Sequence, residues 1–336
     1  MKKAELIAPH TGIPSFYKAP VVDINKVEKG DAVIAGVPMD HGIVLTRTGT
    51  RYGPRAIREA SLFYRAVQEG ASEKTSVNVQ TKKAQRLKER IKLVDIGDIP
   101  IYPQDIKQTS ESITEDVSFL VKNQTLPVLL GGDHYITYPA FEGLCKGFSE
   151  LKGNPKIGHI HIDSHTDFRD SYAGLGKFNH GTSVRRLSEN PMIEYKNIAW
   201  VGLNGNVLDS DIYNIYKKEG LKMITSGNIV DNGIESAIVE AVEAAGDGTD
   251  AVYLSIDIDV VDTAYAPGTG IPVFEGITSK DFLIATEILS KYEIIKAIDL
   301  CEVSPPFDPS ERTAYLAANG LVTLLSPYIF DVVNIE

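Results

Sequence analysis

The sequence of 336 residues has few cysteines and no long apolar run. Its two cysteines, Cys145 and Cys301, each lie in or next to an apolar stretch, so we expect buried thiols rather than a disulfide framework. No run reaches the roughly 18 apolar residues that a membrane-spanning helix needs. The N-terminal residues also lack the apolar core of a signal peptide. The sequence therefore predicts a cytoplasmic protein that does not cross a membrane.

The sequence also lacks an excess of basic residues and the glycine-rich motifs of nucleotide binding. Its formal net charge is −11 and its pI is about 5.2, which argues against a nucleic-acid partner because such surfaces are normally basic. Neither a G-x-G-x-x-G motif nor a Walker lysine motif is present, and this disfavours dinucleotide and phosphate-loop sites. An acidic chain is compatible with a small cationic substrate.

Apolar, β-prone segments alternate with amphipathic segments along the chain. Strands are expected at 32–37, 92–97, 126–130, 157–162, 198–203, 222–224, 251–256 and 294–302. Helices are expected from residue 54, over 104–124, 135–148 and 180–187, near 208–219 and 234–245, after a cap at residue 278, and over 310–325. Because helical patterns rather than tight hairpins separate the strands, the sequence predicts a three-layer α/β/α fold with a parallel sheet of about eight strands.

No linker or internal repeat divides the chain. We therefore expect one domain over residues 1–336, with residues 1–30 as an N-terminal arm. Residues 70–90 carry many lysine, serine, threonine and glutamine residues, and this composition is typical of a solvated excursion.

Two carboxylates, Asp257 and Asp259, follow the strand expected at 251–256. In an extended chain, residues two apart point to the same side. Two acids side by side at the end of an apolar strand repel each other and cost desolvation energy, and a cation between them would relieve both effects. The alternative is one surface acid and one helix cap, but two further strand ends have the same design.

Those two strand ends carry more potential ligands. The strand at 157–162 runs into Asp163-Ser-His-Thr-Asp167, and the strand at 126–130 runs through two glycines into Asp133-His134. Sites in parallel α/β sheets form beyond the carboxyl ends of the strands. The combined set has six members: His134, Asp163, His165, Asp167, Asp257 and Asp259. Four carboxylates and two imidazoles suit two divalent ions better than one zinc ion, which takes three or four ligands, and oxygen-rich ligation suits Mn(II).

The segments Gly131–His134, Asp163–Asp167 and Ser255–Asp259 resemble the three signatures of the ureohydrolases, the arginase and agmatinase superfamily. Matches at 266–270 and 168–172 resemble the agmatinase branch. The resemblance implies an arginase-like fold, a homo-oligomer (trimer or hexamer) and two Mn(II) ions, with Ni(II) as the metal of some relatives. One ion would take His134, Asp163, Asp167 and Asp257, and the other His165, Asp163, Asp257 and Asp259.

The resemblance also implies a hydrolase that cleaves a guanidino compound, a linear amidine, to urea and an amine. Two divalent cations would lower the pKa of a water bound between them. Asp167 would pass a proton to the leaving amine, and His180 would exchange protons with solvent. Glu302 would hold the guanidinium through paired hydrogen bonds. Two plainer interpretations stay open: His180 as a helix-start residue, and Glu302 as an internal ion-pair partner.

The choice of substrate depends on loops. Arg169 favours a carboxylate tail and Asp170 favours an amine tail, unless the two pair with each other. Asn204 stands where relatives commonly have an arginine, and the segment 274–276 departs from their Gly-Gly pair. Agmatine, which would give putrescine and urea, is the leading candidate. The alternatives are 4-guanidinobutyrate, 3-guanidinopropionate and free guanidine, and, from other classes, a catalytically silent binding subunit or a zinc-dependent deacetylase.

Neighbouring polar residues receive supporting roles or none. His159 and His161 are expected in the core or behind the ligands, and Asp133 is expected to support a ligand. His10, His41, Asp262 and Glu275 are not expected to bind metal, although His41 lies in a loop that could line the pocket.

Overall fold

A computed structural model describes residues 11–41, 47–79, 83–172, 174–206 and 208–333. Within them, an eight-stranded sheet has the order β4-β1-β5-β10-β9-β6-β7-β8, and every neighbouring pair is parallel. Its strands are β1 (Ala32–Val37), β4 (Leu93–Asp98), β5 (Leu126–Gly131), β6 (Ile157–Ile162), β7 (Ile198–Leu203), β8 (Lys222–Thr225), β9 (Ala251–Asp257) and β10 (Ile295–Cys301). The predicted fold class is confirmed.

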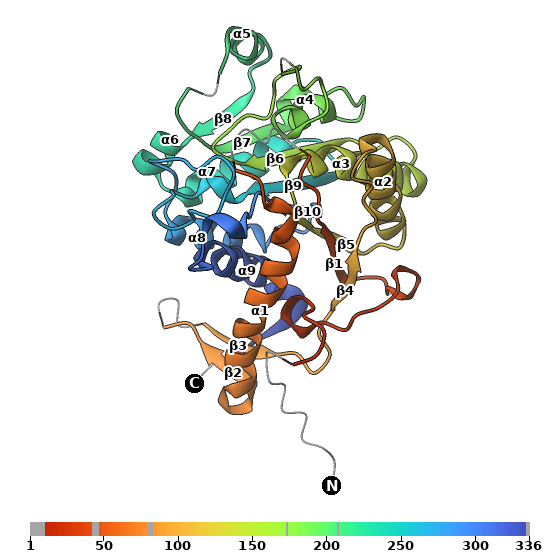
Figure 1. The fold of residues 1–336 in the computed structure, drawn as a ribbon, viewed down its shortest axis with the longest axis vertical. Coiled ribbons are helices and arrows are strands. Elements are labelled where there is room, and N and C mark those ends of the chain that lie inside the picture. The colour runs from red at the N-terminus through yellow and green to blue at the C-terminus, as the bar shows by residue number, and fades with distance from the viewer. Residues whose placement is uncertain (1–10, 42–46, 80–82, 173, 207, 334–336) are drawn as a thin grey trace.

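Helices cover both faces of this sheet. They are α1 (Gly53–Gly70), α2 (Ile106–Lys122), α3 (Thr137–Lys152), α4 (Ser183–Leu187), α5 (Ser210–Glu219), α6 (Ser226–Asn232), α7 (Ile234–Gly246), α8 (Ser279–Leu289), α9 (Arg312–Leu324) and α10 (Ser326–Ile329). In Figure 1, α7 and α8 lie to the left of the sheet and α2 and α3 to the right. The expected cap of α8 is confirmed: Thr278 and Asp281 form a reciprocal capping box. In the described part of the chain, no helix is long and apolar enough to span a bilayer.

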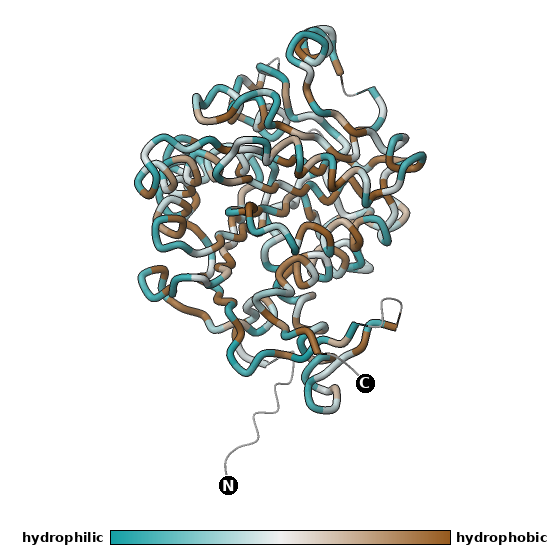
Figure 2. Tube along the Cα trace, turned by 180° about the vertical axis from the view of Figure 1, so that it is seen from behind, coloured by the Kyte–Doolittle hydropathy of each residue, from teal (hydrophilic) through white to brown (hydrophobic). Residues whose placement is uncertain are grey.

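Two hydrophobic cores form because successive side chains of a strand point to opposite faces. In β5, Val128 and Leu130 pack into the core beneath α1, α7, α8 and α9, whereas Leu129 packs into the core beneath α2 and α3. Every residue of β5 is buried, as expected for a parallel strand covered on both faces. Figure 2 shows the hydrophobic segments running through the middle of the molecule.

The solvated excursion predicted for residues 70–90 is wrong in part. β2 (Thr75–Val77) pairs with β3 (Ala84–Leu87), and β3 pairs with β11 (Phe330–Val333), to give a small antiparallel sheet. Ala84 and Leu87 are buried. The polar composition hid these strands because much of the small sheet is exposed and because one partner strand comes from the far end of the sequence. The sequence also gave no prediction of α6 or α10.

The described part of the N-terminal arm packs along β4. Val22 N–H donates to the carbonyl of Asp95, and Phe16 N–H donates to the carboxylate of Asp95 at 2.9 Å. Arg58 of α1 binds both oxygens of the same carboxylate at 2.9 Å. A buried carboxylate with these partners keeps the arm attached to the main sheet. His10 lies outside the described residues.

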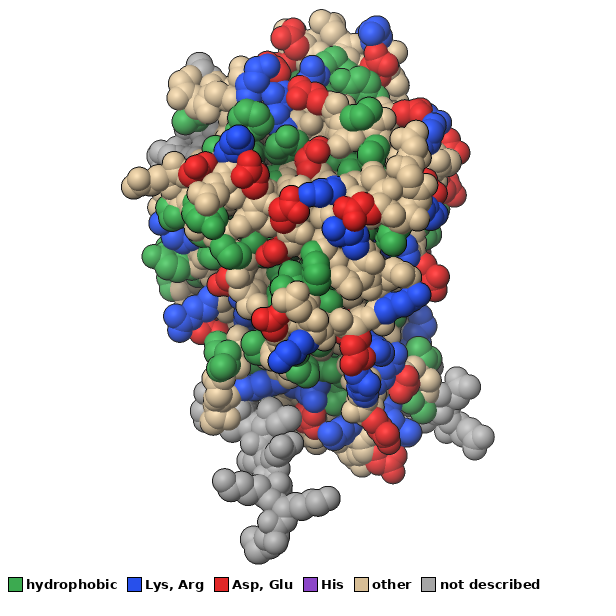
Figure 3. All heavy atoms as spheres, turned by 90° about the vertical axis from the view of Figure 1, so that its right-hand side faces the viewer, with side chains coloured by type: hydrophobic (Ala, Val, Ile, Leu, Met, Phe, Trp, Pro, Cys, Tyr) green, Lys and Arg blue, Asp and Glu red, His purple; other side chains and the backbone are tan. Residues whose placement is uncertain are grey.

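The outer helices carry charges of both signs. Two ion pairs, Lys122–Glu150 and Lys146–Glu115, join α2 to α3. Figure 3, which shows the molecule from the side where these helices lie, has acidic and basic side chains interspersed over the visible face. Such exposed pairs contribute about 1 kcal/mol or less each, so the fold rests on its two cores.

Candidate metal centre

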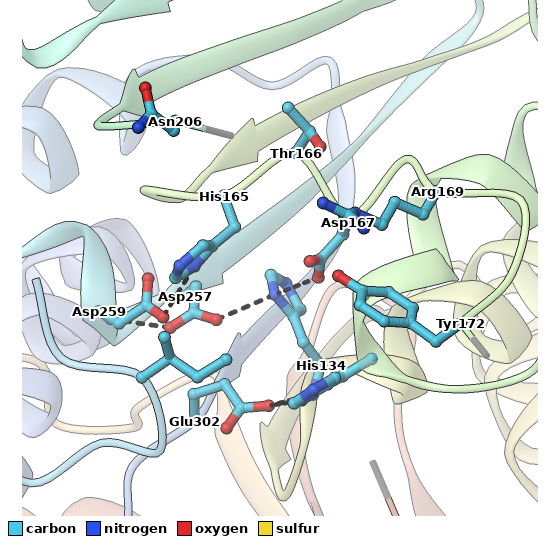
Figure 4. A pocket seen from close by; sticks show the side chains of 13 residues that line it. His134, His165, Thr166, Asp167, Arg169, Tyr172, Asn206, Asp257, Asp259 and Glu302 are labelled. Carbon is cyan, nitrogen blue, oxygen red and sulfur yellow. Dashed lines mark hydrogen bonds and ion pairs between the residues drawn. The ribbon is translucent and has the colours of Figure 1, made fainter. Parts of the chain in front are cut away.

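The site lies where four central strands end. β5, β10, β9 and β6 are consecutive neighbours in the sheet and run in the same direction, so the loops that follow them meet at one edge. A pocket at this edge is lined by His134, His165, Thr166, Asp167, Arg169, Tyr172, His180, Gly181, Asn206, Asp257, Asp259, Ile271 and Glu302. Figure 4 shows the imidazoles and carboxylates of this set pointing toward one another.

His134 stands at the centre of the first ligand group. Its Nδ1 atom lies 3.1 Å from Asp163 Oδ2, 3.2 Å from Asp167 Oδ2 and 3.1 Å from Asp257 Oδ2. Ligand atoms about 2.1 Å from one ion and at right angles to each other are roughly 3 Å apart. His134 Nδ1 and Asp163 Oδ2 are buried and make no well-aligned hydrogen bond among the described residues, although His161 Nε2 approaches Asp163 Oδ2 to 2.9 Å. The group therefore has the spacing and the unsatisfied atoms of one coordination sphere.

His165 stands at the centre of the second group. Its Nδ1 atom lies 3.1 Å from Asp259 Oδ2 and 3.4 Å from Asp163 Oδ1. Asp163 thus presents one oxygen to each group, as a bridging ligand would. Asp257 turns Oδ2 toward His134, while its Oδ1 accepts the N–H of Asp259 at 2.7 Å.

Electrostatics in the cluster favour a cation. Burial, reinforced by the charges of Asp259 and Asp163, raises the pKa of Asp257 well above its ordinary value. Burial likewise raises the pKa of Asp259 to about 6, even though His165 acts in the opposite direction. Without a cation these carboxyls would therefore retain protons to unusually high pH. Two divalent cations would take the place of those protons, so the residues present fit a binuclear centre.

Two acids of the site have left-handed backbone conformations. Asp167 has φ 48° and Glu302 has φ 64°, which cost a non-glycine residue of the order of 1–3 kcal/mol. Hydrogen bonds hold both conformations: Asp167 O accepts from Val184 N–H at 3.0 Å, and Glu302 N–H donates to Gly132 O at 2.9 Å. Such strain persists where the surrounding structure fixes it, and it aims both carboxylates into the pocket.

Glu302 and His180 form an ion pair on the pocket wall. Glu302 Oε1 accepts the N–H of His134 at 2.8 Å and lies 3.1 Å from His180 Nδ1. Burial alone would lower the pKa of His180, but the hydrogen bond and charge of Glu302 outweigh it, and the pKa rises to about 9. Glu302 is therefore the ion-pair partner of His180, as one of the two interpretations expected. Glu302 also lines the pocket, so it can contact a ligand there.

Comparison with known proteins now identifies the family. The family model described as "Arginase family" matches residues 30–326. The chain belongs to the arginase family. The resemblance to ureohydrolases is thus confirmed: the protein is a hydrolase acting on C–N bonds of linear amidines, and its family is one of binuclear metal enzymes.

Three arginase-family proteins with different names are similar to this chain. A guanidinobutyrase of Pseudomonas aeruginosa is 33% identical over 319 residues, which cover 94% of this chain and 92% of the relative. The mitochondrial agmatinase of Gallus gallus is 31% identical over 324 residues, covering 96% and 87%. Among solved structures, proclavaminate amidino hydrolase from Streptomyces clavuligerus superposes with a TM-score of 0.77 at 27% identity, covering 95% of this chain and 98% of that one.

Of the three residues predicted to select the substrate's tail (Arg169, Asp170 and Asn204), Arg169 lines this arginase-family pocket. Its guanidinium stacks on the ring of Tyr172 at 5.0 Å and lies 3.8 Å from Asp209. Asp170 does not line the pocket; its carboxylate pairs with Arg186 at 2.7 Å and Lys177 at 3.2 Å. Two cations thus pair with the half-exposed Asp170 carboxylate, and its role as a holder of an amine tail stays a prediction.

Asn204 and the 274–276 segment, the two places where the resemblance implies a departure from relatives, contact each other. The Asn204 side-chain amide donates to the carbonyl of Phe274 at 2.5 Å, so this side chain fixes the 274 segment instead of lining the pocket. The predicted contact of Asn204 with a substrate stays a prediction. Asn206, two residues further on, lines the pocket in its place.

Sequence reasoning missed five residues of the wall: Thr166, Tyr172, Gly181, Asn206 and Ile271. Tyr172 carried a usable signal, because an aromatic residue in the loop between the ligand motif and His180 is placed to stack on Arg169. Asn206 and Ile271 carried none, since each reaches the pocket through the path of a loop whose partners are distant in sequence.

The supporting residues behave largely as predicted. His161 Nε2 lies 2.9 Å from Asp163 Oδ2, and its ring stacks on His134 at 4.7 Å. His159 is buried, and burial lowers its pKa well below the ordinary value, so it is a neutral core residue. Asp133 accepts the N–H groups of Tyr135 and His41, and therefore links the His134 loop to the loop that follows β1. Asp262 accepts the backbone N–H groups of Ala264 and Glu275 in its own loop.

Proposed function

We propose that this arginase-family hydrolase cleaves a guanidino acid to urea and an amino acid with the help of two divalent cations, Mn(II) in the first instance and Ni(II) as the alternative. The observation that carries the proposal is the position of Arg169 on the pocket wall, while Asp170 is paired elsewhere. A guanidinium at this point suits a carboxylate tail. The guanidinobutyrase relative supports the same substrate class.

The side chains divide the chemistry between them. Cations held by the six ligands would supply the charge that makes a water nucleophilic at neutral pH. Glu302, held in place by His134 N–H and His180, would bind the substrate guanidinium through paired hydrogen bonds. Asp167, beside His134 on the wall, would hold the proton of the attacking water and transfer it to the leaving amine. His180, largely buried but with an exposed margin, would exchange that proton with solvent.

Agmatine is the second candidate. Asp209 lies 3.8 Å from Arg169 and offsets part of its charge, which would ease the approach of an ammonium tail. The agmatinase relative supports this alternative.

A urea-release assay distinguishes the guanidino acid from agmatine as the substrate. The full chain, loaded with Mn(II) or separately with Ni(II), is assayed with 4-guanidinobutyrate, 3-guanidinopropionate, agmatine, arginine and guanidine. For the guanidino acid, we expect Arg169→Gln to raise KM at least about tenfold with a smaller change in kcat, since a charge-assisted hydrogen bond contributes about 1.5–3 kcal/mol. Agmatine turnover should stay level or improve.

Arg55→Gln is the matched control. It removes an exposed arginine of α1 that pairs with Glu59, so its kinetic constants should equal those of the parent. If the parent protein prefers agmatine, and Arg169→Gln leaves its kinetic constants unchanged, agmatine would become the proposed substrate in place of the guanidino acid. Two bound metals without urea from any compound would refute the proposed substrates altogether.

A further inference from the structure

One arginine side chain joins three of the loops that surround the pocket. Arg47, in the loop between β1 and α1, donates from Nε to the carbonyl of Thr269 and from Nη2 to the carbonyl of Pro267, both at 3.0 Å. These two carbonyls belong to the loop between β9 and α8. The guanidinium also lies over the ring of Phe307, in the loop between β10 and α9, with 3.9 Å from Cζ to the ring centroid. Arg47 therefore ties the loops after β1, β9 and β10 to one another.

The backbone that carries Arg47 is itself fixed beside these loops. The N–H of Gly49, two residues further on, donates to Asp40 Oδ2 at 2.9 Å. A Cβ atom on Gly49 would lie 2.7 Å from Pro306 Cγ and 2.8 Å from Ser304 Oγ. The main chain at Gly49 thus packs directly on the loop between β10 and α9, and the guanidinium of Arg47 extends from a fixed point.

Arg47 supplies most of the hydrogen bonds that hold the 267–269 segment. Three successive carbonyls of this segment accept a hydrogen bond: those of Pro267 and Thr269 from Arg47, and that of Gly268 from the N–H of Ser304 at 2.7 Å. A planar guanidinium can donate to two carbonyls and stack on a ring at the same time, whereas the ammonium of a lysine lacks this flat, forked shape. The position of the segment therefore depends on an arginine at residue 47.

The two residues that follow this segment lie at the pocket. Ile271 lines the pocket wall, and a Cβ atom on Gly270 would lie 3.4 Å from Glu302 Oε2. The other carboxylate oxygen of Glu302, Oε1, is the one that contacts His134 N–H and His180. The loop between β9 and α8 thus passes close to Oε2, the oxygen that those two contacts leave for a ligand. Its path sets the width of the space beside the Glu302 carboxylate.

We propose that Arg47 is a positioning residue for the guanidinium end of the substrate. It does not line the pocket; instead, by holding two carbonyls of the 267–269 segment, it keeps Gly270 and Ile271 close to Glu302. Every guanidino compound has the same guanidinium end, so the effect of Arg47 does not depend on the tail. The inference rests on the role of Glu302 in the proposed function, but not on the choice between a guanidino acid and agmatine.

Steady-state kinetics of Arg47→Gln in the full chain, loaded with Mn(II), test the inference. We expect KM to rise about tenfold for each compound that the parent hydrolyses, with a smaller change in kcat, because a displaced wall weakens binding of the guanidinium. The inhibition constant of methylguanidine, a guanidinium with almost no tail, should rise by the same factor. Arg169→Gln, in contrast, should change KM for carboxylate tails alone. Arg47→Lys keeps the charge and can donate to one carbonyl, so its KM should lie between those of the parent and Arg47→Gln.

Arg312→Gln is the matched control. Arg312 Nη1 donates to the carbonyl of Ala264 at 3.2 Å, three residues before Pro267 in the same loop. The variant therefore removes the same kind of contact from the same loop, away from Gly270, and its KM should equal that of the parent.

Amide hydrogen exchange, followed by mass spectrometry, gives a second readout that does not depend on activity. Exchange over 267–271 should be faster in Arg47→Gln than in the parent or in Arg312→Gln. Exchange in the central strands should be the same in all three proteins, which shows that each variant is folded.

Unchanged KM and methylguanidine inhibition in folded Arg47→Gln would overturn the inference and leave the proposed function intact. A lower kcat with unchanged KM would also overturn it, because a smaller amount of active protein would explain that result. Unchanged exchange over 267–271 would contradict the hold of Arg47 on the loop. A parent protein that releases no urea from any of the compounds would refute the proposed function, and the inference with it.

Discussion

Glu302 connects three parts of the site through one side chain. It follows β10, its Oε1 atom accepts the backbone N–H of the ligand His134, and the same oxygen pairs with His180. Its strained backbone is held by Gly132. A residue in this position stabilises the loop after β5 and also the charge of His180, so its replacement should have a pH-dependent effect on stability.

The first prediction concerns Glu302→Gln. The pKa of His180 rises from 6.5 in an ordinary setting to about 9 in the folded protein. A raised pKa adds stability that is fully present below pH 6.5 and is lost as the pH rises through 9. At pH 6 we therefore expect the variant to lose about 3 kcal/mol of unfolding free energy through this linkage, and much less at pH 9.5. Urea denaturation of the metal-free protein at both pH values measures the difference.

The control is the same substitution in a His180→Asn background. There the loss caused by Glu302→Gln should not change with pH, because the titrating imidazole is absent. An equal loss at pH 6 and pH 9.5 in the parent background would contradict the proposed ion pair.

At the scale of elements, the loop after β5 depends on one glycine. Gly132 has φ 37°, and a Cβ atom at this position would lie 2.4 Å from the carbonyl oxygen of Val37 and 2.7 Å from that of Met39. Its own carbonyl accepts the N–H of Glu302. Close packing of the ends of β1, β5 and β10 thus leaves no space for a side chain, and it sets the place of both His134 and Glu302.

The second prediction compares two glycines. Gly132→Ala should destabilise the protein by about 3 kcal/mol or more, because backbone strain and a clash with main-chain oxygens add together. Gly220→Ala, at the end of α5, has a left-handed helical backbone (φ 66°) and an open space around the added Cβ, so only the strain of about 1–2 kcal/mol should appear. Urea midpoints give the stabilities, and Mn(II) titration should show weaker binding in Gly132→Ala alone. If the two variants lost the same amount of unfolding free energy, the clash at Gly132 would add nothing to the backbone strain, and the prediction would be wrong.

At the scale of the whole molecule, the strand order of the main sheet brings the carboxylates of the site together. β5, β10, β9 and β6 bring together segments that are up to about 170 residues apart in sequence. Within one buried cluster they collect four carboxylates, of which Asp257 and Asp259 have raised pKa values. The sheet can tolerate this concentration of charge only when protons or cations compensate it.

The third prediction concerns pH and metal together. In the metal-free protein, Asp259 has a pKa of about 6 instead of 3.8, so its stabilising contribution is lost as the pH rises from about 4 through 6. Cations compete with these protons and bind better as the pH rises. The increase in melting temperature on adding saturating Mn(II) should therefore be larger at pH 8 than at pH 5.5, as measured by calorimetry. Potassium chloride at the same ionic strength is the control, and a smaller gain at pH 8 would contradict the cluster's predicted charge.

The sequence by itself determined the ligand motifs, the family and the parallel α/β fold. Asp257 and Asp259 are two residues apart after an apolar strand, and Asp163, His165 and Asp167 repeat the same spacing. Past the strands the chain does not stay extended, since Asp259 lies in the 3-10 turn Ile258–Val260 and Asp167 has φ 48°. The motifs themselves and the alternation of strands and helices are local properties of the sequence. These features could be predicted because their physical cause lies within a few consecutive residues.

Only the tertiary structure decided which polar groups face each other. Asp170 pairs with Arg186 rather than facing the pocket, Asn204 holds the segment at Phe274, and Asp299 reaches His134 through Ser255. β11 completes a small sheet with β3 from the opposite end of the chain. Each of these pairings depends on strand order and loop path, which bring distant residues within hydrogen-bonding distance, and no local pattern in the sequence encodes that distance.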